Sequence, residues 1–146
     1  MSLPAGRILA IDPGGVRIGL AVSGPLGVVA QPLPTLQSGG RKKDFDALQA
    51  LVEERGIAEI VIGCPLNMDG SRGQMTEFAE RLADDLRDRM GIHVTLWDER
   101  LSSVQAERAL IHGDVRREDR RQLRDRVAAV LILQGFLDWR SLELST

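Results

Sequence analysis

The sequence is poor in cysteine and in aromatic residues: its 146 residues include one cysteine, three phenylalanines, two tryptophans and no tyrosine. The lone Cys64 excludes a disulfide framework and a zinc site built from cysteines. The two histidines, His93 and His112, are far apart in the sequence, which argues against a histidine-rich metal site. The core must therefore be aliphatic, and the 43% hydrophobic content indicates one domain over residues 1–146.

Long hydrophobic runs are also absent. The longest, Val127–Leu133, is about a third of the length that crosses a bilayer. Residues 1–7 lack the basic region and following apolar stretch of an export signal. We therefore expect a cytoplasmic protein that does not bind membranes.

The chain has little excess charge, because 19 basic residues nearly balance 21 acidic ones for a formal net charge of -2. Binding of nucleic acid by bulk charge is excluded, so any polyanion site must be a local patch. The segment from Arg116 to Arg126 contains six arginines and three acidic residues. Arginine favours bidentate contacts to phosphate, so this segment could form such a patch. A solvated helix face with internal ion pairs is the alternative. The arginines that we expect to contact nucleic acid are Arg17, Arg72, Arg100, Arg116, Arg117, Arg120 and Arg121.

The first third of the chain predicts three strands. Residues 7–12 and 17–23 are rich in aliphatic residues, and a third strand is expected around 27–32. The turns between them, at residues 13–15 and 24–25, contain proline and glycine. Connections this short require the three strands to be antiparallel.

The remainder alternates helices with strands. We expect helices over 41–55 and over about 121–139. Two further helices are expected to begin at capping boxes: one runs from Ser71–Gln74 to Gly91, and the other runs from Ser102–Gln105 to about residue 112. Strands are expected over 59–63 and 93–97. Strands that are separated by whole helices are parallel with right-handed crossovers. The predicted fold is therefore of the α/β class: a five-stranded mixed sheet, three antiparallel strands followed by two parallel ones, with helices on both faces.

Carboxylates occupy three places that this fold could bring together. Asp12 ends the first strand, Asp98 and Glu99 follow the fifth, and Asp125 precedes an apolar helical run. Asp125 shares one helical stripe with the small or apolar residues three, four and seven positions later. Taken singly, each has a plainer interpretation: a turn-shaping aspartate, a solvated turn after a strand, and a helix-start charge facing water.

Taken together, the three acids predict a site for hard cations. Oxygen ligands suit Mg²⁺ or Mn²⁺. Two such ions about 4 Å apart activate water and stabilise the leaving oxygen in phosphodiester cleavage. The pattern thus indicates hydrolysis of a nucleic-acid backbone.

Four segments, residues 12–23, 63–71, 98–103 and 125–134, resemble the YqgF/RuvX family, the Holliday-junction-resolvase-like proteins assigned to processing of pre-16S rRNA. The resemblance implies a ribonuclease H-like nuclease domain with a divalent-metal site. It implies Asp12, Glu99 and Asp125 as the catalytic and metal-binding residues, and a substrate-facing loop over 63–71. Asp98 would point to the opposite face of an extended strand, which leaves it a supporting role.

The favoured function is metal-dependent endonucleolytic processing of the 5′ end of precursor 16S rRNA. Asp12 and Asp125 would hold the ions, while Glu99 would ligate and orient the attacking water. One alternative is a Holliday-junction resolvase, which needs two active sites and therefore a dimer, whereas RNA trimming needs only a monomer. A second is an rRNA-binding assembly factor without activity. A third, an actin-like phosphotransferase suggested by Asp12-Pro-Gly14, would need two such domains where this chain supplies one.

Overall fold

The computed structural model describes the backbone of residues 6–14, 16–24, 29–65, 69–99 and 117–144. It describes the side chains of the same residues, except those of 14, 117–126 and 143–144. The helix and the capping box predicted between residues 102 and 112 lie outside these ranges.

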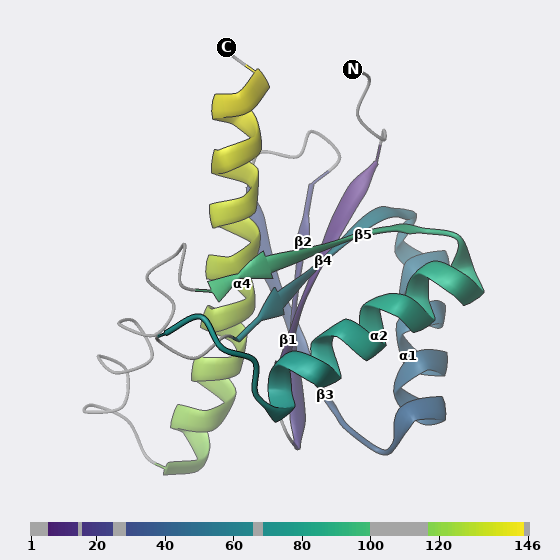
Figure 1. The fold of residues 1–146 in the computed structure, drawn as a ribbon, viewed down its shortest axis with the longest axis vertical. Helices are drawn as coiled ribbons and strands as arrows, with labels where there is room; N and C mark the ends of the chain where they lie inside the picture. The colour runs from purple at the N-terminus through teal and green to yellow at the C-terminus, as the bar shows by residue number, and fades with distance from the viewer. Residues whose placement is uncertain (1–5, 15, 25–28, 66–68, 100–116, 145–146) are drawn as a thin grey trace.

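A five-stranded mixed sheet forms the centre of the fold, with the strand order β3-β2-β1-β4-β5 (Figure 1). Strand β1 pairs antiparallel with β2 and β2 antiparallel with β3, whereas β4 runs parallel to both β1 and β5. The strands are β1 (Arg7–Gly14), β2 (Arg17–Ser23), β3 (Ala30–Gln37), β4 (Ile57–Cys64) and β5 (His93–Asp98). The predicted architecture, three antiparallel strands and then parallel ones, is confirmed.

The third strand was predicted too early in the chain. It begins at Ala30 and continues to Gln37, past Pro32 and Pro34, whereas the sequence favoured an end near residue 32. Proline lacks the N–H that a central strand needs for pairing on both sides. In the described sheet β3 is an edge strand that pairs only with β2, so the missing donors disrupt no second ladder.

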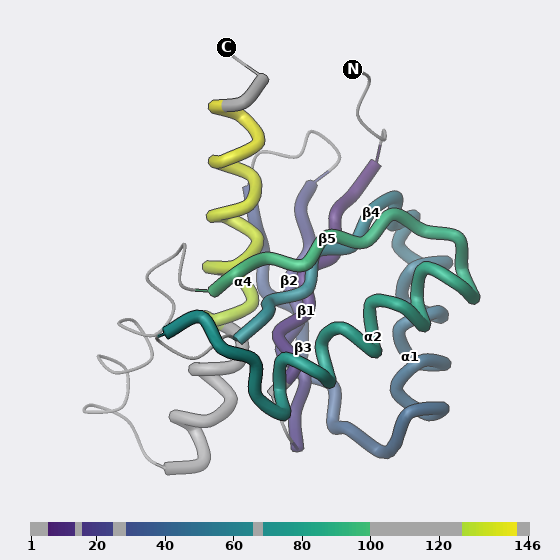
Figure 2. The backbone as a smooth tube through the Cα atoms, viewed as in Figure 1, coloured from purple at the N-terminus to yellow at the C-terminus, as the bar shows by residue number. Residues whose placement is uncertain are grey.

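Helices cover both faces of the sheet. Helices α1 (Arg41–Arg55) and α2 (Gln74–Met90) lie on one face, and α4 (Arg117–Leu144) lies along the other (Figure 1, Figure 2). Both α1 and α2 end at a glycine in the left-handed conformation, Gly56 with φ 64° and Gly91 with φ 62°. Helix α4 exceeds its predicted range at both ends.

The start of α2 differs from the predicted capping box. The residue before the helix is Gly73, and its N–H donates to the hydroxyl of Thr76 at 3.1 Å. Ser71 lies two residues earlier, where its N–H donates to Asp69 Oδ1 at 2.9 Å. Ser71 and Gln74 therefore match the pattern of a capping box without forming one, because Thr76 satisfies the donor instead.

Alternation along the strands divides the core into two layers. On β4, Ile60 and Ile62 pack toward α1 and α2, whereas Val61 packs toward α4. On the α4 side, the edge of Trp97 meets Phe136 and the ring of Trp139 lies nearby, with centroid separations of 5.8 and 6.0 Å. Trp97 and Phe136 thus pack between β5 and α4, and the layer under α1 and α2 is aliphatic, as predicted, apart from Phe45 and Phe78.

No described helix combines the length and the hydropathy that are needed to cross a membrane.

Candidate metal and nucleic-acid site

Asp12 and Glu99 lie on the same face of the sheet, the face that α4 covers. Ala10 packs against α4, and Asp12 follows it by two residues on β1. Trp97 packs against the same helix, and Glu99 follows it by two residues just beyond β5. Both acids are buried, at 4% and 2% relative exposure. Because β1, β4 and β5 are parallel, their carboxyl ends share one edge of the sheet, and the two acids lie at that edge.

Glycines flank Asp12 on both neighbouring strands. Asp12 pairs with Gly19 of β2. On the other side, Ile11 of β1 pairs with Ile62 of β4, which makes Gly63 the next residue in register. A Cβ on Gly63 would lie 3.0 Å from Glu99 Oε1. The Glu99 carboxylate therefore lies over the bare backbone of β4, next to the residue that is in register with Asp12.

Around Cys64, the carboxylates outnumber the cations. Burial raises the pKa of the Cys64 thiol, and the nearby carboxylates of Glu80, Asp98 and Glu99 raise it further, while Arg72 opposes them. The thiol is therefore protonated at neutral pH and is a poor nucleophile. The same carboxylates that raise the pKa of Cys64 favour a cation near this edge.

Asp98 lies on the other face of the sheet. It pairs with Cys64, and its second neighbour along β5, Leu96, packs against the core under α1 and α2. Asp98 contributes to the negative field. Its position on the strand separates it from the face that carries Asp12 and Glu99.

The backbone of Asp125 belongs to α4, seven residues before Ile132. Ala128, Ala129 and Ile132 are all fully buried against the sheet, so the apolar run after Asp125 is a helix packed on the face that carries the other two acids. Asp125 precedes these three residues by three, four and seven positions, and residues at these spacings lie on one side of a helix. The side chain of Asp125 is outside the described set, and among the side chains described no group of three potential metal ligands occurs.

The family model for RuvX, described as Holliday junction resolvase, matches residues 6–139. This chain belongs to the RuvX family. It is 43% identical over 135 residues to a protein of Clostridioides difficile (strain 630) named "Putative pre-16S rRNA nuclease", covering 92% of this chain and 96% of that one. A protein of the same name from Myxococcus xanthus (strain DK1622) is 46% identical over 132 residues, covering 90% and 87%.

The fold of this RuvX protein is that of RuvC. The structure of RuvC from T. thermophilus in complex with Holliday junction substrate matches with a TM-score of 0.57 at 12% identity, over 92% of this chain and 96% of that one. A second structure of RuvC from Thermus thermophilus matches with a TM-score of 0.55 at 15% identity. The ribonuclease H-like architecture expected from the sequence is thereby confirmed.

The predicted nucleic-acid-binding arginines differ in what surrounds them. Arg17 begins β2 on the α4 face, four residues before Ala21, and among the described side chains its Nη1 is a buried donor without a hydrogen-bond partner. Arg72 forms an ion pair with Glu80 of α2, so a phosphate would have to compete for it. Arg117, Arg120 and Arg121 belong to the first turns of α4, and Arg100 and Arg116 lie outside the described residues.

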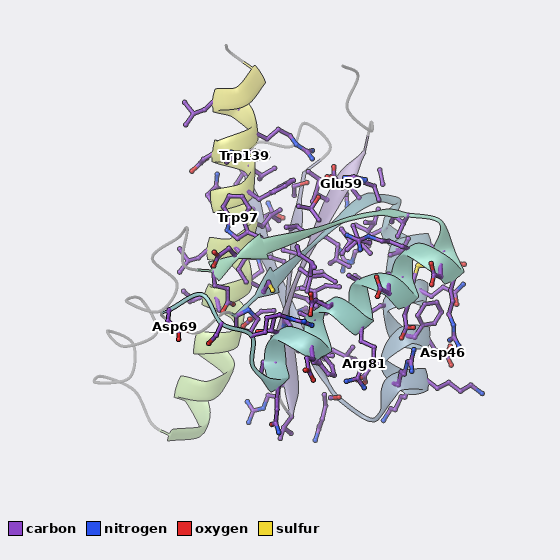
Figure 3. The ribbon with its side chains drawn as sticks, in the orientation of Figure 1. Asp46, Glu59, Asp69, Arg81, Trp97 and Trp139 are labelled. Atoms are coloured by element: carbon purple, nitrogen blue, oxygen red, sulfur yellow. The ribbon has the colours of Figure 1, made fainter. Side chains whose placement is uncertain are left out.

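Sequence reasoning missed a buried carboxylate at the other end of this RuvX sheet. Glu59, near the start of β4, accepts hydrogen bonds from both terminal nitrogens of Arg140 on α4. In Figure 3, Glu59 lies toward the upper end of the sheet and Asp69, which follows β4, lies toward the lower left. Glu59 is thus at the amino end of β4, where it anchors α4. It lies away from the edge of the sheet that carries Asp12 and Glu99, which we call the acidic edge. Eighty-one residues separate the pair, so no local pattern reveals it.

Proposed function

We propose that this RuvX-family protein is a divalent-metal-dependent phosphodiester hydrolase that processes the 5′ end of precursor 16S rRNA, with Asp12, Glu99 and Asp125 as its catalytic acids. The observation that carries the proposal is the placement of two buried carboxylates, Asp12 and Glu99, on one face and one edge of the sheet. The names of its relatives support rRNA as the substrate. Such a substrate also implies a cytoplasmic location.

The residues present fit a hard divalent ion. Two buried carboxylates on one face are costly unless a cation or hydrogen bonds compensate them. The donors are carboxylate oxygens, which Mg²⁺ and Mn²⁺ prefer to nitrogen and sulfur. Gly63 adds no side chain of its own beside the Glu99 carboxylate, although Ile132 Cδ1 of α4 approaches the same place. When bound, a pair of such ions supplies activation of water and stabilisation of the leaving oxygen.

The protein's own side chains have separate parts in this proposal. Asp12 and Asp125 hold the ions from a strand end and from the facing helix. Glu99 completes the ligand set and accepts a hydrogen bond from the attacking water, which orients it toward the phosphorus. Buried guanidinium donors are unfavourable when unsatisfied. Because Nη1 of Arg17 has no partner among the described residues, it supports a contact from Arg17 to a phosphate oxygen near the cleaved bond.

The arginines at the start of α4 extend the proposed contact surface. Arg117, Arg120 and Arg121 precede Asp125 on the same helix, within three turns of it. Contacts of this kind fix the position of the RNA backbone and add affinity that depends on salt, without reading sequence. The substrate is therefore recognised in this proposal by its structure near the precursor end.

The competing substrate is a four-way DNA junction, because the RuvX family model is described as Holliday junction resolvase. Cleavage of a precursor rRNA leader and of a synthetic four-way junction, compared at equal Mn²⁺, distinguishes the two. We expect the leader to be cut by a monomer and the junction to remain intact. Preferential cleavage of the junction by a homodimer would identify a resolvase. Binding of the leader with no cleavage at any Mn²⁺ concentration would identify an assembly factor.

A further inference from the structure

Gly63 lies at the centre of the acidic edge. It is the penultimate residue of β4 and pairs with Trp97 of β5. Alternation places it on the α4 face, because Val61, two residues earlier, packs against that helix. On its other side, Asp12 of β1 follows the paired residues Ile11 and Ile62. Gly63 thus lies between the strand that carries Asp12 and the strand that leads to Glu99.

A side chain at this position would meet two neighbours. A Cβ on Gly63 would lie 2.5 Å from Ile132 Cδ1 and 3.0 Å from Glu99 Oε1. The first distance is far shorter than carbon atoms tolerate, so α4 or the isoleucine would have to move. The second would displace the carboxylate by a few tenths of an ångström. Both neighbours belong to the proposed active site or to the helix that carries part of it.

Glycine weakens a strand interior, since it adds chain entropy to the unfolded state and buries no side chain. At the corresponding alternate position, Val61 fills the space under α4 with a branched side chain. The absence of a side chain at Gly63 is therefore local to the acidic edge. It coincides with the place where the Glu99 carboxylate and Ile132 of α4 both approach the backbone of β4.

We propose that Gly63 is a positioning residue of the metal site: its bare backbone sets where the Glu99 carboxylate lies and how closely α4, with Asp125 seven residues before Ile132, approaches the sheet. The inference rests on the proposed function for its consequence, since these are the same carboxylates. Its geometric part, the control of Glu99 by Gly63, is independent of any metal. Ligand oxygens must lie within about 0.2 Å of their proper distance, so small displacements matter.

The test separates the two contacts of Gly63. Ile132→Val removes Cδ1 and with it the shorter clash, so that Gly63→Ala in this background isolates the contact with Glu99. Gly24→Ala is the matched control, because no atom of the described residues lies within 4 Å of the Cβ that it would add. Crystal structures without metal and Mn²⁺ titration calorimetry are compared for I132V, G63A/I132V and G24A.

We expect the Glu99 carboxylate to be displaced in G63A/I132V relative to I132V, and Mn²⁺ binding to weaken by about tenfold or more, the scale seen when residues that orient ligands are changed. G24A should match the unchanged protein in both measurements. A Glu99 carboxylate that stays in place, or equal Mn²⁺ affinity in I132V and G63A/I132V, would overturn the inference. If the unchanged protein binds no Mn²⁺, the proposed function fails, and the crystal structures alone decide the role of Gly63.

Discussion

Arg140 of α4 holds the carboxylate of Glu59 on β4 with both terminal nitrogens of its guanidinium, one of them at 2.8 Å, and the same guanidinium lies 4.5 Å from the ring centroid of Phe136. The Glu59 side chain is 1% exposed and that of Arg140 is 16% exposed. This ion pair fixes one part of α4 to the amino end of β4. Ile132 fixes the same helix at the carboxyl end, beside Gly63. The helix that carries Asp125 is therefore held at two points on one strand.

Arg140→Met should lower the free energy of unfolding by about 3–5 kcal/mol, because it leaves the Glu59 carboxylate buried without its partner. Urea denaturation measures the change. Glu59→Gln combined with Arg140→Met should recover much of the loss, since no uncompensated charge remains. As a control, Arg41→Ala breaks an ion pair with Asp85 that lies at the surface, and it should cost much less. A loss below about 1 kcal/mol in R140M would contradict this role for the pair.

Asp12→Asn should abolish cleavage while RNA binding stays nearly unchanged. The substitution keeps the size of the side chain but removes the charge that a hard cation requires. We expect the cleavage rate to fall by more than about 100-fold, since even changes to residues that only orient ligands reach that scale. Single-turnover cleavage and filter binding at the same Mn²⁺ concentration provide the two readouts. Undiminished cleavage by D12N would refute the metal-site assignment.

Arg17→Met should weaken substrate binding without destabilising the protein. The buried Nη1 of Arg17 has no hydrogen-bond partner among the described residues, so its removal sacrifices no folded-state contact of that atom. A charged hydrogen bond to phosphate contributes about 1.5–3 kcal/mol, which corresponds to a rise in KM of about ten- to 100-fold. Steady-state kinetics and thermal unfolding check both parts. An unchanged KM would remove Arg17 from the contact surface.

Because of the Cys64 thiol, we expect the free energy of unfolding to fall in the alkaline range. Its pKa in the folded protein is raised above the ordinary thiol value of 9.0 by burial and by neighbouring carboxylates. The unfolded chain therefore releases this proton at lower pH than the folded protein does. The contribution of the protonated thiol to stability is fully present below pH 9, and it is lost as pH rises through the pKa of Cys64 in the folded protein.

Unfolding followed from pH 8 to pH 11 tests this prediction, with Cys64→Ala as the comparison. The alkaline decline should be shallower in C64A than in the unchanged protein, and cleavage at neutral pH should be retained. Identical pH profiles for the two proteins would show that the thiol does not contribute. Loss of cleavage in C64A despite a folded protein would contradict the conclusion that the Cys64 thiol does not act as a nucleophile.

Local patterns were sufficient for most of the fold. The helix over 41–55 and the strand over 17–23 have the boundaries that the sequence predicted, because apolar spacing and flanking glycines define both. Tight turns required the first three strands to be antiparallel, and the sheet has that order. The third strand was misplaced because its prolines argue against a strand unless its position at the sheet edge is known.

The acidic edge could be predicted in part. In the sequence, Asp12 ends one predicted strand and Glu99 follows another, and the parallel arrangement of those strands carries both to one edge. The contact of Gly63 with Glu99 and Ile132 could not be predicted, because it joins three segments that are distant in sequence. The glycine that ends the apolar run of β4 was the available signal, since glycine in a strand often marks close approach.

The most direct test of the central claim is a crystal structure of the protein soaked in Mn²⁺, with anomalous data collected at the manganese absorption edge. We expect anomalous peaks bounded by carboxylate oxygens of Asp12, Glu99 and Asp125, with two ions about 4 Å apart. Carboxylates of these three residues separated by more than roughly 10 Å, or manganese bound elsewhere, would contradict it.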